Sequence, residues 1–265
     1  MYIFICPLAY TYNTRLRSLI SLLSWGVIYF LLLLLFVMVQ NDGINYTEIM
    51  IFCVSIIIVY NNYEIGYIIN DTETIKKEKK PTMRLGRNAL DIYESNKLLI
   101  YGIRVCLSIV LTLFLIKILK VQGYYIISAW LILPVFIIYN SIRNRLNLAL
   151  HFTLVTLRYC SPILIVLQPE HIINVILNVS FIFPLPNLIE RCSEPRFDFS
   201  IFHKVKLNHN KWRVFYYFMA TTITGLALYM KMLSEYVVFI CCLYMLVYRV
   251  LSPLLIQKKN DYKII

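Results

Sequence analysis

The chain has 265 residues, of which 60% are apolar and only 15% are charged. Soluble globular proteins average about 45–50% apolar and about 25% charged residues. This composition excludes an ordinary soluble globule and predicts an integral membrane protein. The formal net charge is +12. In so apolar a chain, this charge favours basic segments lying against an anionic membrane face and argues against nucleic-acid binding.

The apolar residues are grouped in stretches of the length that crosses a bilayer. A hydrocarbon core of about 30 Å requires about 20 apolar residues per helix. We therefore expect an all-α, polytopic membrane bundle that forms a single domain over residues 1–265. Eight stretches meet the requirement, and these are 18–40, 47–70, 98–119, 123–142, 146–167, 171–190, 212–232 and 235–257.

The distribution of Lys and Arg predicts how these spans are oriented. Most of the 26 basic residues fall in segments that an inward-facing N-terminus places on one side, and only Lys117, Lys120 and Lys231 lie near the other face. The positive-inside rule then places both termini and the loops at about 71–97 and 191–211 in the cytoplasm. The expected location is the inner or plasma membrane. No signal peptide is expected, because the first apolar patch is short and no basic residue precedes it.

Two acidic groups follow the second and sixth spans, whose C-terminal ends face the same side. A spacing of four places Glu190 and Glu194 on one stripe of a helix. Carboxylates at helix C-termini oppose the macrodipole, and two facing groups repel, so a divalent cation is expected between them. Oxygen ligands beside a phosphate favour Mg²⁺. A solvated loop is the alternative interpretation of either group. The first acidic group, after the second span, contains Asn70, Asp71, Thr74 and Glu78. The second acidic group, after the sixth span, contains Glu190, Glu194 and Asp198.

Basic side chains adjoin the first acidic group and end the fourth span. The run from Lys76 to Arg84, which includes Lys80, supplies donors that a diphosphate needs. Tyr139 and Arg143 lie over the same face. An arginine at this position is also typical of a topological anchor, so phosphate binding by Arg143 is one of two interpretations.

Two charged residues lie inside predicted spans. Arg158 falls midway along the fifth span, where burial costs about 2.5–3.5 kcal/mol, so a partner is expected, and Glu64 is one candidate counter-ion. A structural ion pair and a role in a substrate cavity remain open. The half of the second span that contains Glu64 is also polar, because it includes Asn61, Asn62, Tyr63 and Tyr67. This polarity predicts a surface that lines a cavity within the bundle.

The motifs together resemble the UbiA-type intramembrane prenyltransferases over residues 15 to 257. Asn70 and Asp71 match the opening of the family's first acidic motif, Thr74 stands where its middle acid would be, and Glu78 replaces its last acid. Tyr139 and Arg143 match the segment that ends the fourth helix. Glu190 and Glu194 fall at the second acidic motif, with Asp198 one step further. The family usually has nine spans, so the eight counted here indicate a shortened C-terminal end or one span not counted.

The resemblance implies a transferase that moves a prenyl or polyprenyl group from its diphosphate to an aromatic or other lipophilic acceptor, with Mg²⁺ as cofactor. It implies three overlapping sets of site residues. The catalytic set is Asp71, Glu78, Glu190 and Glu194; the metal ligands are these four with Asn70 and Asp198; the substrate-binding set is Asn70, Lys80, Arg84, Tyr139, Arg143, Arg158 and Glu64.

Two other functions stay open. A branch of the same superfamily transfers phosphoribose onto a polyprenyl phosphate and carries an arginine in the fifth helix, which Arg158 resembles. A non-catalytic lipid-binding or transport protein is the alternative from another class. Membrane lipid is an expected partner in all three cases.

Overall fold

The computed structural model describes residues 1–77, 81–142, 144–197, 199–202, 205, 207–232 and 236–261, with the side chains of Ser200 and of residues 254–261 outside the description. The described residues are helical or lie in short turns and contain no strand. The main helices are α1 (Tyr2–Ile5), α2 (Ala9–Thr14), α3 (Leu19–Trp25), α4 (Leu32–Gln40), α5 (Tyr46–Thr72), α6 (Arg87–Lys117), α7 (Gly123–Trp130), α8 (Ile132–Ser141), α9 (Leu146–Leu167), α10 (Ile172–Ile182), α11 (Pro184–Cys192), α13 (His209–Tyr229) and α14 (Val237–Asp261).

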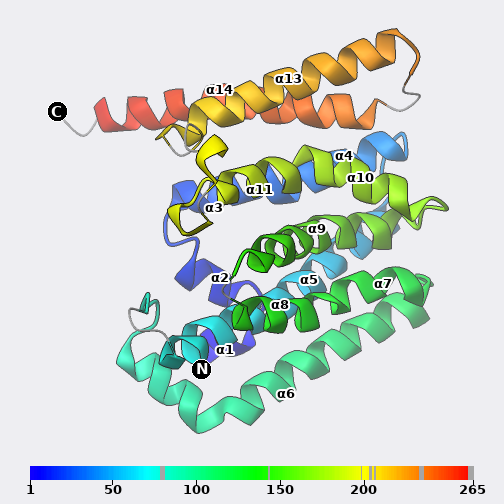
Figure 1. Ribbon diagram of the computed structural model, residues 1–265. Helices are drawn as coiled ribbons and strands as arrows, with labels where there is room; N and C mark the ends of the chain where they lie inside the picture. Colours follow the sequence, from blue (N-terminus) through cyan, green and yellow to red (C-terminus); the bar gives the residue numbers. More distant parts are fainter. Residues whose placement is uncertain are drawn as a thin grey trace.

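The long helices lie side by side in stacked layers (Figure 1). α5 packs against α6, α8 and α9, and α9 in turn packs against α7, α10 and α11. α13 and α14 form an outer pair that contacts the rest mainly through α4 and α10. Within its most apolar window α5 is 72% buried, against 22% for α6. α5 is therefore the central helix, which explains why it tolerates more polar residues than a lipid-facing helix.

The predicted all-α bundle is confirmed, but the count of eight spans is not. Five helical segments of the described chain are long and apolar enough to cross a membrane. A sixth is obtained if α10 and α11, which meet at a bend of 49°, are counted as one span. The apolar part of α14, Val237–Pro253, is shorter than a full span.

The third predicted span begins earlier than its apolar pattern indicates. We expected a loop up to residue 97 and a helix over 98–119, but α6 begins at Arg87 and continues past a kink at Asn96. The first part of α6 is held by a second small core, in which Tyr93 packs near Phe4 and Tyr10 of the N-terminal segment. Tertiary packing thus makes helical a segment that the hydropathy pattern assigns to a loop.

Proline residues and a π-turn interrupt the helices inside the bundle. Pro162 lacks an N–H, which leaves the carbonyl of Arg158 without its helical partner, and the Tyr29 hydroxyl donates to that oxygen at 3.0 Å. Pro186 likewise frees the carbonyl of Ile182, which accepts from Tyr217 at 3.0 Å. In the π-helical segment Gly26–Leu31 between α3 and α4, two carbonyls accept hydrogen bonds from tyrosine hydroxyls. Tyr159 donates to the carbonyl of Ile28, and Tyr244 donates to that of Val27. Several tyrosines therefore complete the backbone hydrogen bonding of the bundle.

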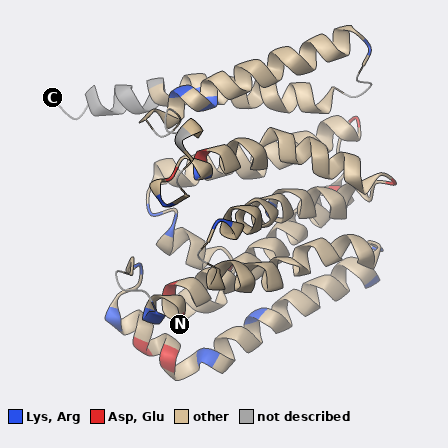
Figure 2. Ribbon diagram, in the orientation of Figure 1, with Lys and Arg blue, Asp and Glu red and all other residues tan. Residues whose placement is uncertain are grey.

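Charged residues gather mainly at one end of the helical stack (Figure 2). That end contains the C-termini of α5 and α11 and the N-terminus of α13, whereas few basic residues lie at the opposite end (Figures 1 and 2). Arg15, Arg84, Arg191 and Arg213 all belong to this end, where they pair with carboxylates. We call it the basic end of the bundle.

Gly66 permits the close approach of α5 and α8. A Cβ atom at this position would overlap ring atoms of Phe136, and the Gly66 carbonyl accepts a hydrogen bond from Asn140 Nδ2 at 3.0 Å.

We expect Gly66→Val to destabilise the bundle by about 1–3 kcal/mol through overpacking, measured as a lower thermal unfolding temperature in detergent. Gly102→Ala is the control, because nothing lies within 4 Å of its added Cβ. Equal stability of the two variants would contradict close packing of α5 on α8.

Candidate functional site

A row of aromatic rings lies between α5 and α8 toward the basic end of the bundle. The ring centroids of Tyr63 and Phe136 are 4.8 Å apart, those of Tyr67 and Phe136 are 5.6 Å apart, and those of Phe136 and Tyr139 are 5.7 Å apart. Tyr63 and Phe136 are buried, while Tyr67 and Tyr139 are partly exposed. We call these four residues the aromatic row.

Three arginines from different elements reach the aromatic row. Arg15, just after α2, lies 4.2 Å from the centroid of the Tyr67 ring. Arg158 of α9 lies 5.0 Å from that of Tyr63. Arg191 of α11 donates to the Tyr139 hydroxyl at 2.9 Å. The fold therefore brings together cations that are more than thirty residues apart in every pairing of the sequence.

Arg158 is the cation with the least compensation. Its guanidinium lies 5.8, 5.0 and 5.4 Å from the ring centroids of Tyr29, Tyr63 and Tyr159. Its Nε is buried without a hydrogen-bond partner, and none of the ion pairs between described residues includes it. The side chain is nevertheless partly exposed although it lies midway along α9. Ring faces supply only part of the stabilisation that a desolvated cation needs, so this position favours an anionic ligand.

Glu64 is not the counter-ion of Arg158, and this expectation is wrong. Its carboxylate pairs with Arg104 of α6 at 3.0 Å, and both side chains are fully buried. The same carboxylate accepts hydrogen bonds from the backbone N–H groups of Leu8 at 3.1 Å and Thr11 at 2.6 Å. Glu64 therefore joins the N-terminal segment to α5 and α6 and does not face the aromatic row.

Asp71 lies at the end of α5 and is already fully engaged. Its carboxylate pairs with Arg15 at 2.7 Å and with Arg84 at 3.0 Å, and it accepts from the Tyr10 hydroxyl at 3.0 Å and from Asn70 Nδ2 at 3.1 Å. Burial, and then the neighbouring carboxylate, raise the pKa of Tyr10. These bonds occupy both oxygens of Asp71, and the two arginines offset its charge.

The second acidic group is neutralised in the same way. Arg213 of α13 binds both oxygens of Glu190, at 2.6 and 2.7 Å. Glu194 pairs with Arg191 at 2.7 Å and with Arg196 at 2.9 Å. The predicted helical stripe is wrong here, because α11 ends at Cys192 and Glu194 follows its last turn. In the first acidic group, α5 ends at Thr72, and Thr74 lies in a short 3-10 helix, Thr74–Lys77.

The two acidic groups lie at the same end of the bundle but bind separate sets of arginines. α5 and α11 each pack against α9, which separates them, and the carboxylates of Asp71 and Glu190 share no hydrogen-bonding partner. No group of three or more His, Cys, Asp or Glu that could hold a metal occurs among the residues described. Asp71, Glu190 and Glu194 are bound to arginines in this arrangement, and the Mg²⁺ set stays a prediction because Glu78 and Asp198 lie outside the described residues. Four of its expected members or neighbours, Glu78, Lys80, Arg143 and Asp198, lie outside the described residues.

The polar residues of α5 that we expected to line a cavity instead join helices. Asn61 Nδ2 donates to the Arg104 carbonyl at 2.7 Å and to Ser108 Oγ at 2.8 Å, and Ser108 Oγ donates to Asn62 Oδ1 at 2.6 Å. Asn62 also donates to the carbonyl of Ala129 at 2.9 Å. The three polar side chains of this network, Asn61, Asn62 and Ser108, are fully buried. They stabilise the contacts of α5 with α6 and α7, and of that half of α5 only Tyr63 and Tyr67 belong to the aromatic row.

A cavity of about 310 Å³ lies beside the second acidic group. Glu190 and Arg213 line it together with Asn187, Tyr217 and Arg249. On the α9 side, Asn187 hydrogen-bonds with His151 Nε2 at 2.8 Å. A mixed polar and apolar space therefore opens between α11, α13 and α14.

Sequence reasoning missed the roles of Arg15, Arg191 and Arg213. Arg15 and Arg191 lie next to predicted spans and Arg213 lies at the start of one, where a basic residue is typical of a topological anchor, so the sequence pattern gives no signal of a site. Arg191 adjoins Glu190 in the sequence, but only the fold shows that it turns toward Tyr139.

No protein-family model, curated protein or solved structure matches the chain. The assignment of function therefore depends on the geometry of these side chains.

The Glu64–Arg104 pair gives a test of the interior described above. Removing one partner of a buried ion pair leaves an uncompensated charge and costs about 3–5 kcal/mol. We expect Arg104→Met to lower the thermal unfolding temperature sharply and the double variant Glu64→Gln/Arg104→Met to recover part of the loss, because Gln is neutral and its one amide oxygen can still accept from one of the two N–H groups that bind Glu64. Lys76→Met, in an exposed ion pair, is the control and should change stability by less than about 1 kcal/mol. A double variant less stable than Arg104→Met would contradict the pairing.

Proposed function

We propose that this protein is a membrane-embedded transferase that binds an isoprenoid diphosphate and transfers the prenyl group to a lipophilic acceptor. The observation that carries the proposal is the convergence of Arg15, Arg158 and Arg191 on the aromatic row. Several helices that could cross a membrane surround this row, which is consistent with a substrate that has a long apolar tail.

Arginine is the residue best suited to the charged part of such a substrate. Its planar guanidinium can bind phosphate oxygens through two parallel hydrogen bonds, and the bonds are strengthened by charge. Arg158 has no carboxylate partner among the described residues, so an incoming phosphate would supply the missing negative charge. Arg15 and Arg191 keep part of their surface, with side chains 19% and 26% exposed, and are accessible to a second phosphate.

The aromatic row supports the same proposal from the chemistry of the transfer. Breaking the C–O bond sends its electron pair to the departing diphosphate and leaves an allylic cation on the prenyl group. Arginines stabilise the charge that develops on the leaving group. The faces of Tyr63, Tyr67 and Phe136 can stabilise the cation, and their bulk would exclude water until the acceptor attacks. The acceptor's attacking atom then forms the new bond and loses its proton.

Mg²⁺ remains a proposed cofactor on the strength of the resemblance alone. Asp71, Glu190 and Glu194 hold arginines in the arrangement described, so no step is assigned to a metal here. The transfer assay is therefore run with Mg²⁺ and, separately, with a chelator. The difference in transfer rate between the two reactions measures the contribution of the metal.

The full chain, purified in detergent with added lipid, would be incubated with a panel of labelled prenyl diphosphates and aromatic acceptors. We expect transfer by the wild type, and a loss of about 100-fold or more in Arg158→Met because a donor to the leaving group is removed. Lys117→Met is the control and should keep wild-type activity, because Lys117 is the last residue of α6 and lies away from the basic end of the bundle. Absence of transfer under all conditions, or full activity of Arg158→Met, would contradict the proposal.

Phosphoribosyl transfer is the second candidate, and the position of Arg158 in the middle of α9 favours it. Under this alternative a polyprenyl phosphate is the acceptor and phosphoribosyl diphosphate is consumed. Assaying the same preparations with that pair separates the two reactions, since each predicts a product that the other does not. Tight binding of isoprenoid phosphates with neither reaction would instead favour the non-catalytic lipid-binding alternative.

A further inference from the structure

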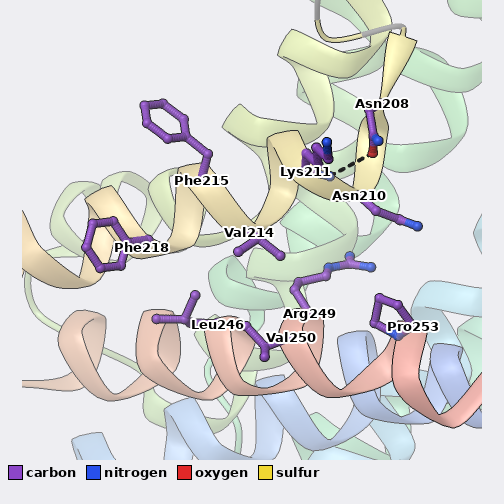
Figure 3. A pocket seen from close by; sticks show the side chains of 10 residues that line it. All are labelled: Asn208, Asn210, Lys211, Val214, Phe215, Phe218, Leu246, Arg249, Val250 and Pro253. Carbon is purple, nitrogen blue, oxygen red and sulfur yellow. Dashed lines mark hydrogen bonds between the residues drawn. The ribbon is translucent and has the colours of Figure 1, made fainter.

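The outer helix pair contains a groove that is distinct from the aromatic row and shares only Arg249 with the cavity beside Glu190. It lies between α13 and α14, has a volume of about 830 Å³ and is open to the outside of the bundle (Figure 3). None of its lining residues belongs to the aromatic row or binds Asp71. Whatever occupies this groove is therefore separate from the site of the proposed transfer.

The groove is polar at one end and apolar along the rest of its length. Asn208, Asn210 and Lys211 from the start of α13 gather near Arg249 of α14, as Figure 3 shows. The remaining part is lined by apolar side chains from both helices. Several of these are largely exposed, with fractions of 58% for Phe215, 56% for Phe218 and 46% for Val250. A row of exposed apolar side chains in line with a polar end fits a molecule that has a polar head and an apolar chain.

The polar end carries positive charge, which the Tyr248 ring, 5.2 Å from the Arg249 guanidinium, compensates only in part. The lining residues include Lys211 and Arg249 and no carboxylate. Arg249 Nε is buried and has no hydrogen-bond partner among the described residues. Glu190 is the carboxylate that shares the neighbouring cavity with Arg249, but both of its oxygens are bound by Arg213. The N-terminus of α13 adds a further partial positive charge, because the Asn208 side chain caps only the N–H of Lys211.

We propose that this groove binds an anionic membrane phospholipid. Its phosphodiester lies between Arg249, Lys211 and the first turn of α13, and one acyl chain runs along Phe215, Phe218 and Val250. The phosphate oxygens bind the Arg249 guanidinium and the free N–H groups of α13, and the chain covers apolar surface. The lipid contacts both helices, so it fastens α13 to α14 at the basic end of the bundle.

The test uses the delipidated full chain in a neutral detergent, with binding of phosphatidylglycerol and phosphatidylcholine measured by native mass spectrometry. We expect phosphatidylglycerol to bind more tightly than phosphatidylcholine and to raise the thermal unfolding temperature. A cation near a membrane anion contributes about 1 kcal/mol, so Arg249→Leu should weaken phosphatidylglycerol binding about fivefold. Lys117→Leu is the matched control and should leave it unchanged.

A second variant and a second probe separate a lipid from a free anion. Val250→Trp fills the apolar part of the groove without changing its charge, so it should weaken phosphatidylglycerol binding. Inorganic phosphate should give no comparable stabilisation. The proposal is overturned if phosphate stabilises the protein as strongly as phosphatidylglycerol, if the two lipids bind equally, or if Arg249→Leu and Val250→Trp both bind like the wild type.

Discussion

The arrangement of this bundle depends on satisfying backbone groups where its helices break. An apolar interior offers no water, so an unpaired carbonyl there costs several kcal/mol. Pro162 and Pro186 each free one carbonyl, and tyrosine hydroxyls from other helices fill both positions. Each such bond fixes the relative position of two helices. The bond from Tyr29 to the carbonyl of Arg158 holds the Tyr29 ring beside the Arg158 guanidinium. The same hydrogen bond therefore satisfies a backbone carbonyl and holds an aromatic ring beside the Arg158 cation.

The charges at the basic end follow a second constraint, in which Asp71, Glu190 and Glu194 are held by arginine while Glu73 and Glu94 are held by lysine. Asp71 binds two guanidinium groups and Glu190 binds one with both oxygens. Arg158 and Arg249 remain without a carboxylate among the described residues. Among these residues the arginines outnumber the carboxylates that bind them. The same balance underlies both proposals, because one uncompensated arginine faces the aromatic row and the other faces the groove of the outer helix pair.

The N-terminal segment belongs to the interior and is not a peripheral extension. The buried pair of Glu64 and Arg104 binds it from two sides, since Arg104 Nε donates to the carbonyl of Phe4 at 2.6 Å and Glu64 accepts from Thr11. This attachment also positions Arg15, which follows α2 and reaches both Asp71 and Tyr67. A short segment before the first long helix therefore contributes directly to the candidate site, and its position depends on charges in α5 and α6.

Composition and hydropathy alone determined that the chain is an all-α bundle with helices suited to a membrane, because apolar stretches of that length have few other stable arrangements. They also indicated that charge gathers at one end. The number of spans and the partners of each charge were decided by the tertiary structure. Glu64 was one candidate partner of Arg158 but pairs with Arg104, and Asn61 was expected in a cavity but joins two helices. Sequence spacing places a residue along its own helix, whereas its partner depends on how neighbouring helices are rotated and packed.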